Sequence, residues 1–119
     1  MFADMADTPY VAVIFSSLRS DVDPAGYDAM AVRMDQLAAE QPGFVGIESA
    51  RDPDGFGLTV SYWATEGAGR DWKRVAEHLG AQELGRARWY QRYIVRVATV
   101  QRQYDWRCDD PDLRLQSPE

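Results

Sequence analysis

The sequence predicts an α+β domain whose strands and helices follow the order β-α-β-β-α-β. Three observations predict this order: runs of β-branched and aromatic residues near both ends of the chain, two apolar patterns with helical spacing, and a central pair of strand-like runs around a turn sequence. The chain has 119 residues, of which 45% are hydrophobic, and this length and composition suit a single domain with one core.

The first strand is predicted at Tyr10–Phe15, with an extension toward Arg19. Its apolar side chains occupy both alternating faces, which is typical of a central strand. A helix is expected to begin at Asp23-Pro24, because aspartate accepts hydrogen bonds from free helix amides and proline fits the first helical position. The helix is expected to end at Pro42-Gly43. Its apolar stripe consists of Tyr27, Met30, Ala31, Met34, Leu37 and Ala38.

A hairpin is predicted from Phe44–Arg51 and Gly57–Trp63, which flank the turn sequence Asp52-Pro53-Asp54-Gly55. Proline is preset for a turn, and glycine readily adopts a positive φ. Side chains alternate along a strand, so each face of the second arm has its own set of residues. One face should carry Thr59, Ser61 and Trp63, and the other Leu58, Val60 and Tyr62.

Thr65 is a predicted N-cap for a second helix. We expect this helix to break near Gly80 or Gly85, and a short helix to follow it and reach about Trp89. The last strand is predicted to include Tyr93 and to run toward Tyr104. The stripe of the second helix consists of Trp72, Val75, Ala76 and Leu79.

This order is the split βαβ pattern of ferredoxin-like folds, in which two helices cover one face of a four-stranded antiparallel sheet. The other face remains apolar, because the first and last strands are apolar on both sides, and monomers rarely expose such a patch. We therefore expect a homodimer that pairs the two sheets. The domain is expected to span residues 10–106, between an N-terminal tail (1–9) and a flexible C-terminal tail (107–119).

Charge and cysteine content exclude several classes of function. Thirteen Lys and Arg against nineteen Asp and Glu give a net charge of -6, which argues against nucleic-acid binding. The single cysteine, Cys108, suits a reducing compartment. No basic start with an apolar run marks a signal peptide, and the longest apolar run is too short for a membrane span. We expect a cytoplasmic protein without a membrane partner.

Two side chains stand out as candidates for chemistry. His78, the only histidine, has an ordinary pKa near neutrality and is the natural general base or metal ligand. It falls at the border of the second helix's stripe, so its ring could reach a pocket or point into solvent. Trp63 shares its strand face with Thr59 and Ser61, and an aromatic on a semi-polar face suits the wall of a small-molecule pocket.

Cationic and metal-binding patterns are weaker. Four arginines near the start of the last strand could form an anion site, although solvated positions or pairs with acids are the more ordinary interpretation. These are Arg86, Arg88, Arg92 and Arg96. Cysteine-histidine clusters for zinc are missing from the sequence, and the aspartates near the C-terminus lack the pattern of a calcium loop, so we expect no metal site.

Several segments resemble the antibiotic-biosynthesis monooxygenase family of dimeric α/β barrels, over about Tyr10 to Tyr104. They are Gln41-Pro42-Gly43-Phe44-Val45-Gly46, Val60-Ser61-Tyr62-Trp63, Asp71-Trp72-Lys73 and Glu77-His78. The family includes cofactor-free oxygenases of polycyclic aromatic phenols and haem-degrading monooxygenases. The resemblance implies a ligand between the sheet and the helices, with Trp63 in the pocket wall.

Haem-degrading members carry an asparagine on the first strand and a histidine ligand on the second helical segment. Here the first-strand candidates are Phe15, Ser16 and Ser17, and His78 lies about one helical turn too early. The leading expectation is a homodimeric barrel that oxygenates a small aromatic ligand without a metal or flavin, with His78 as proton acceptor. The ligand-binding residues expected are Phe15, Thr59, Ser61, Trp63 and Trp72. A non-catalytic ligand-binding or stress-associated barrel and a haem-binding, haem-degrading enzyme remain the alternatives.

Overall fold

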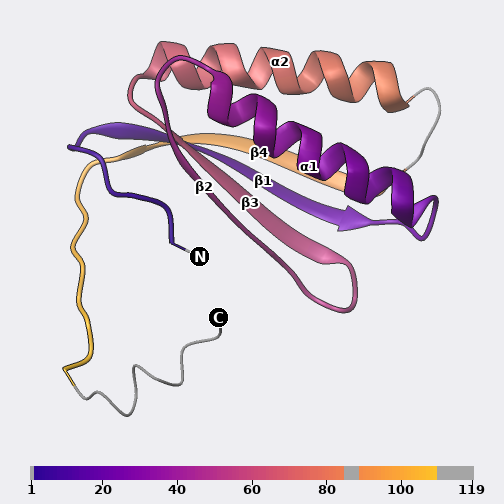
Figure 1. The fold of residues 1–119 in the computed structure, drawn as a ribbon, viewed down its shortest axis with the longest axis horizontal. Coiled ribbons are helices and arrows are strands. Elements are labelled where there is room, and N and C mark those ends of the chain that lie inside the picture. Colours follow the sequence, from indigo (N-terminus) through magenta and orange to yellow (C-terminus); the bar gives the residue numbers. More distant parts are fainter. Residues whose placement is uncertain (1, 85–88, 110–119) are drawn as a thin grey trace.

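A computed structural model describes residues 2–84 and 89–109 of the chain. Within them, strands and helices follow the predicted β-α-β-β-α-β order, which confirms the fold class (Figure 1). The elements are β1 (Tyr10–Arg19), α1 (Pro24–Glu40), β2 (Phe44–Arg51), β3 (Phe56–Trp63), α2 (Glu66–Leu84) and β4 (Tyr90–Val100). Neither described helix is both long and apolar enough to cross a membrane.

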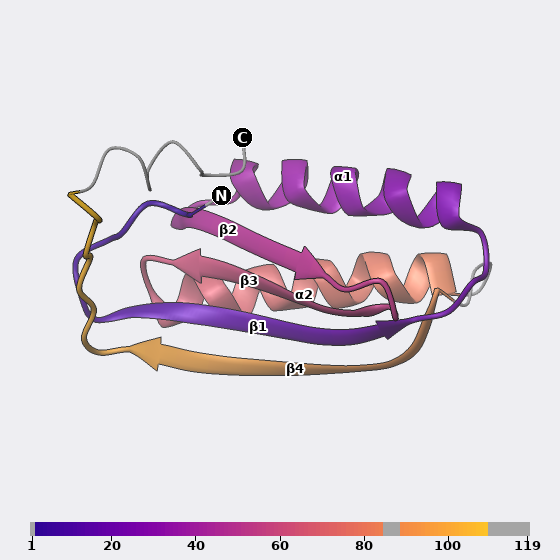
Figure 2. The ribbon, with the colours of Figure 1, turned by 90° about the horizontal axis from the view of Figure 1, so that it is seen from below.

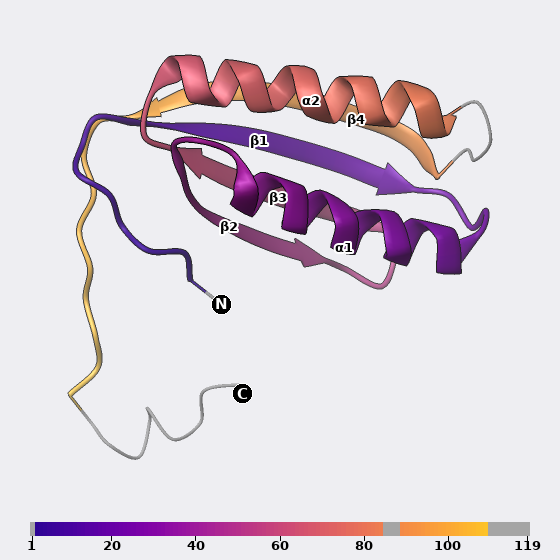
Figure 3. The same cartoon turned by 45° about the horizontal axis from the view of Figure 1, so that its top comes forward.

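The four strands form one antiparallel sheet in the order β2-β3-β1-β4 (Figure 2). Both helices lie on the same face of this sheet, α1 packing against β2 and α2 against β1 and β3 (Figure 3). The space between this face of the sheet and the two helices is therefore where a core or a ligand site is expected to lie (Figure 3).

β1 is the central strand, as its two apolar faces predicted. It pairs with β3 on one side and β4 on the other, so that Val13 lies opposite both Ser61 and Val97. Val11 and Val13 belong to the core under the helices. Tyr10, the first residue of β1, is also buried and packs edge-on against Tyr62. Burial on both faces explains why this segment lacks the usual alternation of apolar and polar residues.

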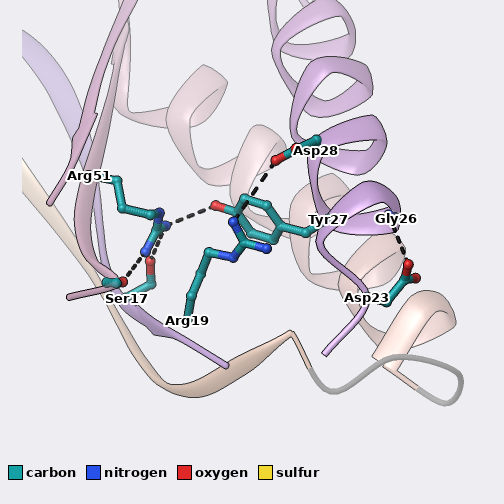
Figure 4. A network of polar contacts seen from close by, with 8 residues as sticks. Ser17, Arg19, Asp23, Gly26, Tyr27, Asp28 and Arg51 are labelled. Carbon is teal, nitrogen blue, oxygen red and sulfur yellow. Dashed lines mark hydrogen bonds and ion pairs between the residues drawn. The ribbon is translucent and has the colours of Figure 1, made fainter. Parts of the chain in front are cut away.

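The helix starts form as the sequence predicts. The Asp23 carboxylate accepts a hydrogen bond from the backbone N–H of Gly26 at 3.1 Å, and proline occupies the start of α1 (Figure 4). The Thr65 hydroxyl accepts the N–H of Ala68 at 3.1 Å. Each bond satisfies one of the amides that a helix N-terminus leaves without an internal partner.

Two expectations for the second half of the chain need correction. α2 continues through Gly80 to Leu84, so a break at Gly80 is wrong. A glycine inside a helix costs only about 1 kcal/mol, which the packing of the preceding turns against the sheet offsets. The proposed break at Gly85 and most of the short helix after it fall on residues 85–88, outside the described residues. β4 ends at Val100, and residues 101–109 run away from the sheet without regular structure (Figure 1).

An aromatic cluster fills one end of the space under the helices. Trp63 is fully buried, stacks on Trp72 with ring centres 5.7 Å apart, and meets Phe44 edge-on at 5.6 Å. Its indole N–H donates to the Ser61 hydroxyl at 2.9 Å, so the polar edge of the ring is satisfied. Tight packing at this end fixes the distance between α2 and the sheet.

The opposite face of the sheet has no helix on it. Phe56 and Leu58 are 49% and 43% exposed there. The chain ends cover part of this face: the Ala3 N–H donates to Glu48 at 2.9 Å, and Tyr10 donates to Gln103 at 2.5 Å. The remaining apolar surface is free of cover from the described residues.

Because Trp63 is fully buried and packs against Trp72 and Phe44, Trp63→Ala should lower the free energy of unfolding by about 3–5 kcal/mol. Urea denaturation followed by far-UV circular dichroism measures this loss. Phe2→Ala is the matched control, since Phe2 is 94% exposed, and it should leave the unfolding midpoint nearly unchanged. Equal midpoints for the two variants would contradict the assignment of Trp63 to the core.

Candidate functional site

A cavity of about 430 Å³ lies between the sheet and the two helices, next to the aromatic cluster. Its volume falls in the range of small-molecule sites, and its wall is mainly apolar, as in most such sites. The apolar wall consists of Val13, Phe15, Met30, Ala31, Met34, Ile47, Trp72, Ala76 and Val95.

The sheet side of the cavity also carries hydroxyl groups. Ser49, Thr59 and Ser61 all line it. Ser49 lies opposite Thr59 in the pairing of β2 with β3, and Ser61 follows two residues later on the same face of β3. Small hydroxyl side chains leave room above the sheet and offer hydrogen bonds to a ligand that is otherwise held by apolar contacts.

The structure brings four of the expected ligand-binding residues to this one cavity: Phe15, Thr59, Ser61 and Trp72. Trp63 lies behind the wall, because its ring is fully buried and stacked on Trp72. Of the residues that it contacts, Trp72 and Ser61 line the cavity, so Trp63 can act on a ligand through them. Strand alternation therefore predicted which residues of β3 face the helices, while the depth of each side chain depended on the helix above it.

His78 lies outside the cavity. Its side chain is exposed and borders a separate groove together with Arg33 and Leu37 of α1. Ala76 points into the cavity, and two further residues correspond to a rotation of about 200° around a helix axis. Of the two orientations that the helical pattern left open, the structure has the outward one.

An arginine that the sequence did not single out lies at one end of the cavity. Arg51 ends β2, and its guanidinium donates to the Ser17 hydroxyl at 2.8 Å and to the Tyr27 hydroxyl at 2.9 Å (Figure 4). It also donates to the backbone carbonyl of Gly55. The three acceptors belong to β1, α1 and the hairpin turn, so the guanidinium is fixed from three sides.

Tyr27 lies beside a second guanidinium. Arg19 sits over the Tyr27 ring, 3.8 Å from its centre, and Arg51 is 5.4 Å from the same centre. Both distances are within cation–π range. Arg19 also approaches the exposed carboxylate of Asp28 at 4.0 Å (Figure 4). Two guanidinium groups therefore lie around Tyr27 at this end of the cavity, which we call its positive end.

Tyr90 completes the positive end, with its ring 5.7 Å from that of Tyr27. Burial raises the pKa of Tyr90, and the hydrogen bond and charge interaction with Tyr27 act in the same direction, while Arg51 and Arg19 oppose them. The phenol stays protonated at neutral pH and remains a hydrogen-bond donor.

Acidic side chains on the helices border the other part of the cavity. Glu77 pairs with Lys73 at 2.9 Å along α2. Asp35 of α1 is exposed by its overall accessible surface and has no ion-pair partner among the described residues, and partial desolvation of its carboxyl group, which lines the cavity, raises its pKa. Asp35 is thus the carboxylate in this wall best suited to accept a proton.

The arginines suggested by the sequence are placed elsewhere. Arg92 and Arg96 are exposed and pair in register with Leu18 and Ile14, on the sheet face opposite the helices. Arg86 and Arg88 lie outside the described residues. Alternation could have placed Arg51 on the same face of β2 as Ile47 and Ser49, but it gives no sign of the contacts that hold the guanidinium.

The described residues contain no group of three or more His, Cys, Asp or Glu side chains that could hold a metal ion. The cavity wall likewise does not fit a histidine-ligated haem, because the single histidine of the chain is exposed outside it. A haem bound in this cavity would therefore have no histidine of this chain as its axial ligand.

A family model described as antibiotic biosynthesis monooxygenase matches residues 9–84, and the chain belongs to this family. The chain is also 54% identical over 97 residues to the uncharacterized protein YqjZ of Bacillus subtilis (strain 168), covering 82% of this chain and 84% of YqjZ. The family resemblance inferred from the sequence is confirmed.

Solved structures share the fold at low identity. A mutant of SnoaB, a cofactor-independent oxygenase from Streptomyces nogalater, has a TM-score of 0.64 at 18% identity, covering 79% of this chain and 95% of SnoaB. Protein SO0527 from Shewanella oneidensis has a TM-score of 0.63 at 11% identity, and the match covers 79% of this chain and 93% of SO0527. At these identities the likeness establishes the fold.

The raised pKa of Asp35 predicts a pH-dependent effect on stability. A group whose pKa is raised by folding contributes stability below its unfolded pKa, and this contribution is lost as the pH rises through the folded pKa. Asp35→Asn removes that loss, so the variant should have a slightly higher urea midpoint than the wild type at about pH 7 and no advantage at about pH 3. Asp54→Asn, in the exposed hairpin turn, controls for the loss of one negative charge. An Asp35→Asn midpoint at or below that of the wild type at neutral pH would contradict the assignment.

Proposed function

We propose that this protein binds a small, largely apolar aromatic molecule in the cavity between sheet and helices and oxygenates it with dioxygen, without a metal or flavin. The observation that carries the proposal is a cavity of about 430 Å³ whose apolar wall is interrupted by hydroxyl groups and a carboxylate without an ion-pair partner among the described residues. Membership in the monooxygenase family supports the reaction class, and SnoaB, which shares the fold, is named a cofactor-independent oxygenase.

The reaction needs an electron-rich substrate, because the protein supplies no electrons. In an anthrone-type phenol, a ring methylene loses a proton to a base, and the resulting carbanion transfers electrons to O₂ to give a peroxide. The peroxide loses water and leaves a ketone. One O₂ is consumed, one of its atoms enters the substrate and the other leaves as water with the two methylene hydrogens. The substrate provides all four electrons.

Asp35 replaces His78 as the proton acceptor in this proposal. It lines the cavity, has no ion-pair partner among the described residues and has a raised pKa, whereas Glu77 is paired with Lys73. A carboxylate with a raised pKa is a stronger base. His78, which is exposed and borders a different groove, has no role in the step.

The other residues of the wall orient the substrate. Phe15 and Trp72 offer aromatic surface, and Thr59 and Ser61 offer hydroxyls that can donate to a substrate oxygen as negative charge develops on it. Packing of Trp63 behind Trp72 and Ser61 holds both in place.

Oxygen uptake with anthrone, in buffer containing a metal chelator, tests the proposal. Ala76→Trp places a large ring in the cavity and should abolish uptake and the binding of anthrone, while Ala39→Trp, on the exposed side of α1, should leave both unchanged. Binding without oxygen uptake would support the non-catalytic alternative. Uptake that survives Ala76→Trp would contradict the location of the site.

In the same assay, Asp35→Asn should lower the rate about 100-fold or more, since general base catalysis contributes about that much. His78→Ala should retain the wild-type rate. A rate that falls only in His78→Ala would reverse the assignment of the base.

We also propose that a second copy of the chain covers the open face of the sheet. Phe56 and Leu58 expose apolar surface there, and Tyr104 and Trp106, in the segment that leaves the sheet, are 90% and 76% exposed. Monomers rarely leave so much aromatic and aliphatic surface in water.

Sedimentation velocity at micromolar concentration should therefore show a dimer. Leu58→Glu should convert it to a monomer with an unchanged circular dichroism spectrum, because a carboxylate facing a second sheet is costly to bury. Val32→Glu, on the exposed side of α1, should remain dimeric. A wild-type monomer at this concentration would refute the dimer.

A further inference from the structure

We propose that the ligand of this cavity carries an anionic oxygen, a carboxylate or a phenolate, and that this oxygen binds Arg51 at the end of the cavity where β1, β2 and α1 meet. The inference rests on the proposed function, since it concerns the same cavity. It adds the substrate class and the residue that recognises it.

The first support is a charge without a counter-charge. Arg51 is partly buried and lines the cavity. Its hydrogen-bond partners among the described residues are all neutral: the hydroxyls of Ser17 and Tyr27 and the carbonyl of Gly55. No described carboxylate forms an ion pair with it. A partly desolvated cation is unfavourable until an anion approaches it, so a ligand that brings a negative oxygen gains more here than a neutral one.

The second support is an excess of hydrogen-bond donors. A guanidinium has five N–H donors, and three hydrogen bonds are formed within the described part of the chain, which leaves two for a ligand. The indole N–H of Trp89, which also lines the cavity, is buried without an acceptor among the described residues. Buried donors are normally paired, so this end of the cavity lacks an acceptor that a ligand oxygen can supply.

The third support is preorganisation. Three elements fix Arg51, and Arg19 adds a second positive charge over the face of the Tyr27 ring (Figure 4). The acid that approaches Arg19, Asp28, is largely exposed, so solvent screens its charge. Tyr90 adds a protonated phenol to the same end. Fixed donors around a desolvated cation lower the cost of ordering on binding.

Isothermal titration with 2-naphthoate and its neutral analogue 2-naphthamide, on the full chain at neutral pH, tests the inference without any mutation. The wild type should bind 2-naphthoate at least tenfold more tightly. Arg51→Gln, which keeps a hydrogen-bonding side chain, should bind both equally, and Arg51→Lys should restore the preference for the acid. Arg70→Gln, on the exposed side of α2 and outside the cavity lining, is the matched control and should keep the wild-type preference.

A second measurement separates the two kinds of anionic oxygen. The wild type should lower the pKa of bound 4-nitrophenol, followed by its phenolate absorbance, and Arg51→Gln should not. A preference for naphthoate without this shift assigns the site to carboxylates, and the shift without the preference assigns it to phenolates; either result supports the inference.

The outcomes also separate the inference from the proposed function. If the wild type binds naphthoate and naphthamide equally and leaves the pKa of 4-nitrophenol unchanged, the anionic ligand is refuted and the aromatic cavity stands. If the preference for acid persists in Arg51→Gln, the role of Arg51 is refuted. If naphthoate, naphthamide and anthrone all fail to bind, the proposed function fails, and the inference fails with it.

Discussion

The contact of α2 with the sheet at the Trp63 end determines most of this structure. Gly69 lies so close to β1 that a Cβ atom there would be 3.1 Å from Val11, and Trp63 stacks directly on Trp72 of the next helical turn. This packing fills one end of the space under the helices. At the other end, the sheet carries the smaller side chains of Thr59 and Ser49, and a cavity lies above them. Core and site are thus two ends of one layer.

Placing polar groups in that layer has a cost in stability, which the chain offsets locally. The Arg51 guanidinium binds three acceptors, and Ser61 accepts from the Trp63 indole. The buried indole N–H of Trp89 is left without an acceptor within the described residues, and Asp35, although exposed, has a raised pKa and no ion-pair partner there. Residues that satisfy one another stabilise the fold, while those left over in the same cavity are the ones a ligand can satisfy.

The sequence predicted features that depend on local physics. The caps at Asp23 and Thr65 and the alternation that places Thr59 and Ser61 together need only neighbouring residues, and all appear in the structure. How deeply a side chain is buried, and which way it points, was harder to predict from the sequence. Helical spacing left His78 at a border, and only the packed position of α2 decides that it faces outward.

Arg51 was not predictable in the same way. Its acceptors Ser17 and Tyr27 lie 34 and 24 residues away in the sequence, and no local motif connects them. The arginines near the start of β4 suggested an anion site because they are close in sequence, yet Arg92 and Arg96 face away from the cavity. Sequence proximity is a poor guide to an anion site, because such a site is defined by which cations lack a partner after folding.

The two charged ends of the cavity give it a direction. Tyr27 and Asp35 both belong to α1, and eight residues correspond to about 12 Å along a helix axis. An elongated aromatic acid whose anionic group binds Arg51 beside Tyr27 would extend from that end along the cavity toward Asp35. That orientation turns the end without the anionic group toward the proposed base. The opposite charges of Arg51 and Asp35 can therefore select both the class of ligand and the carbon that faces the proposed base. The apolar wall between them adds affinity but distinguishes little between one aromatic ligand and another.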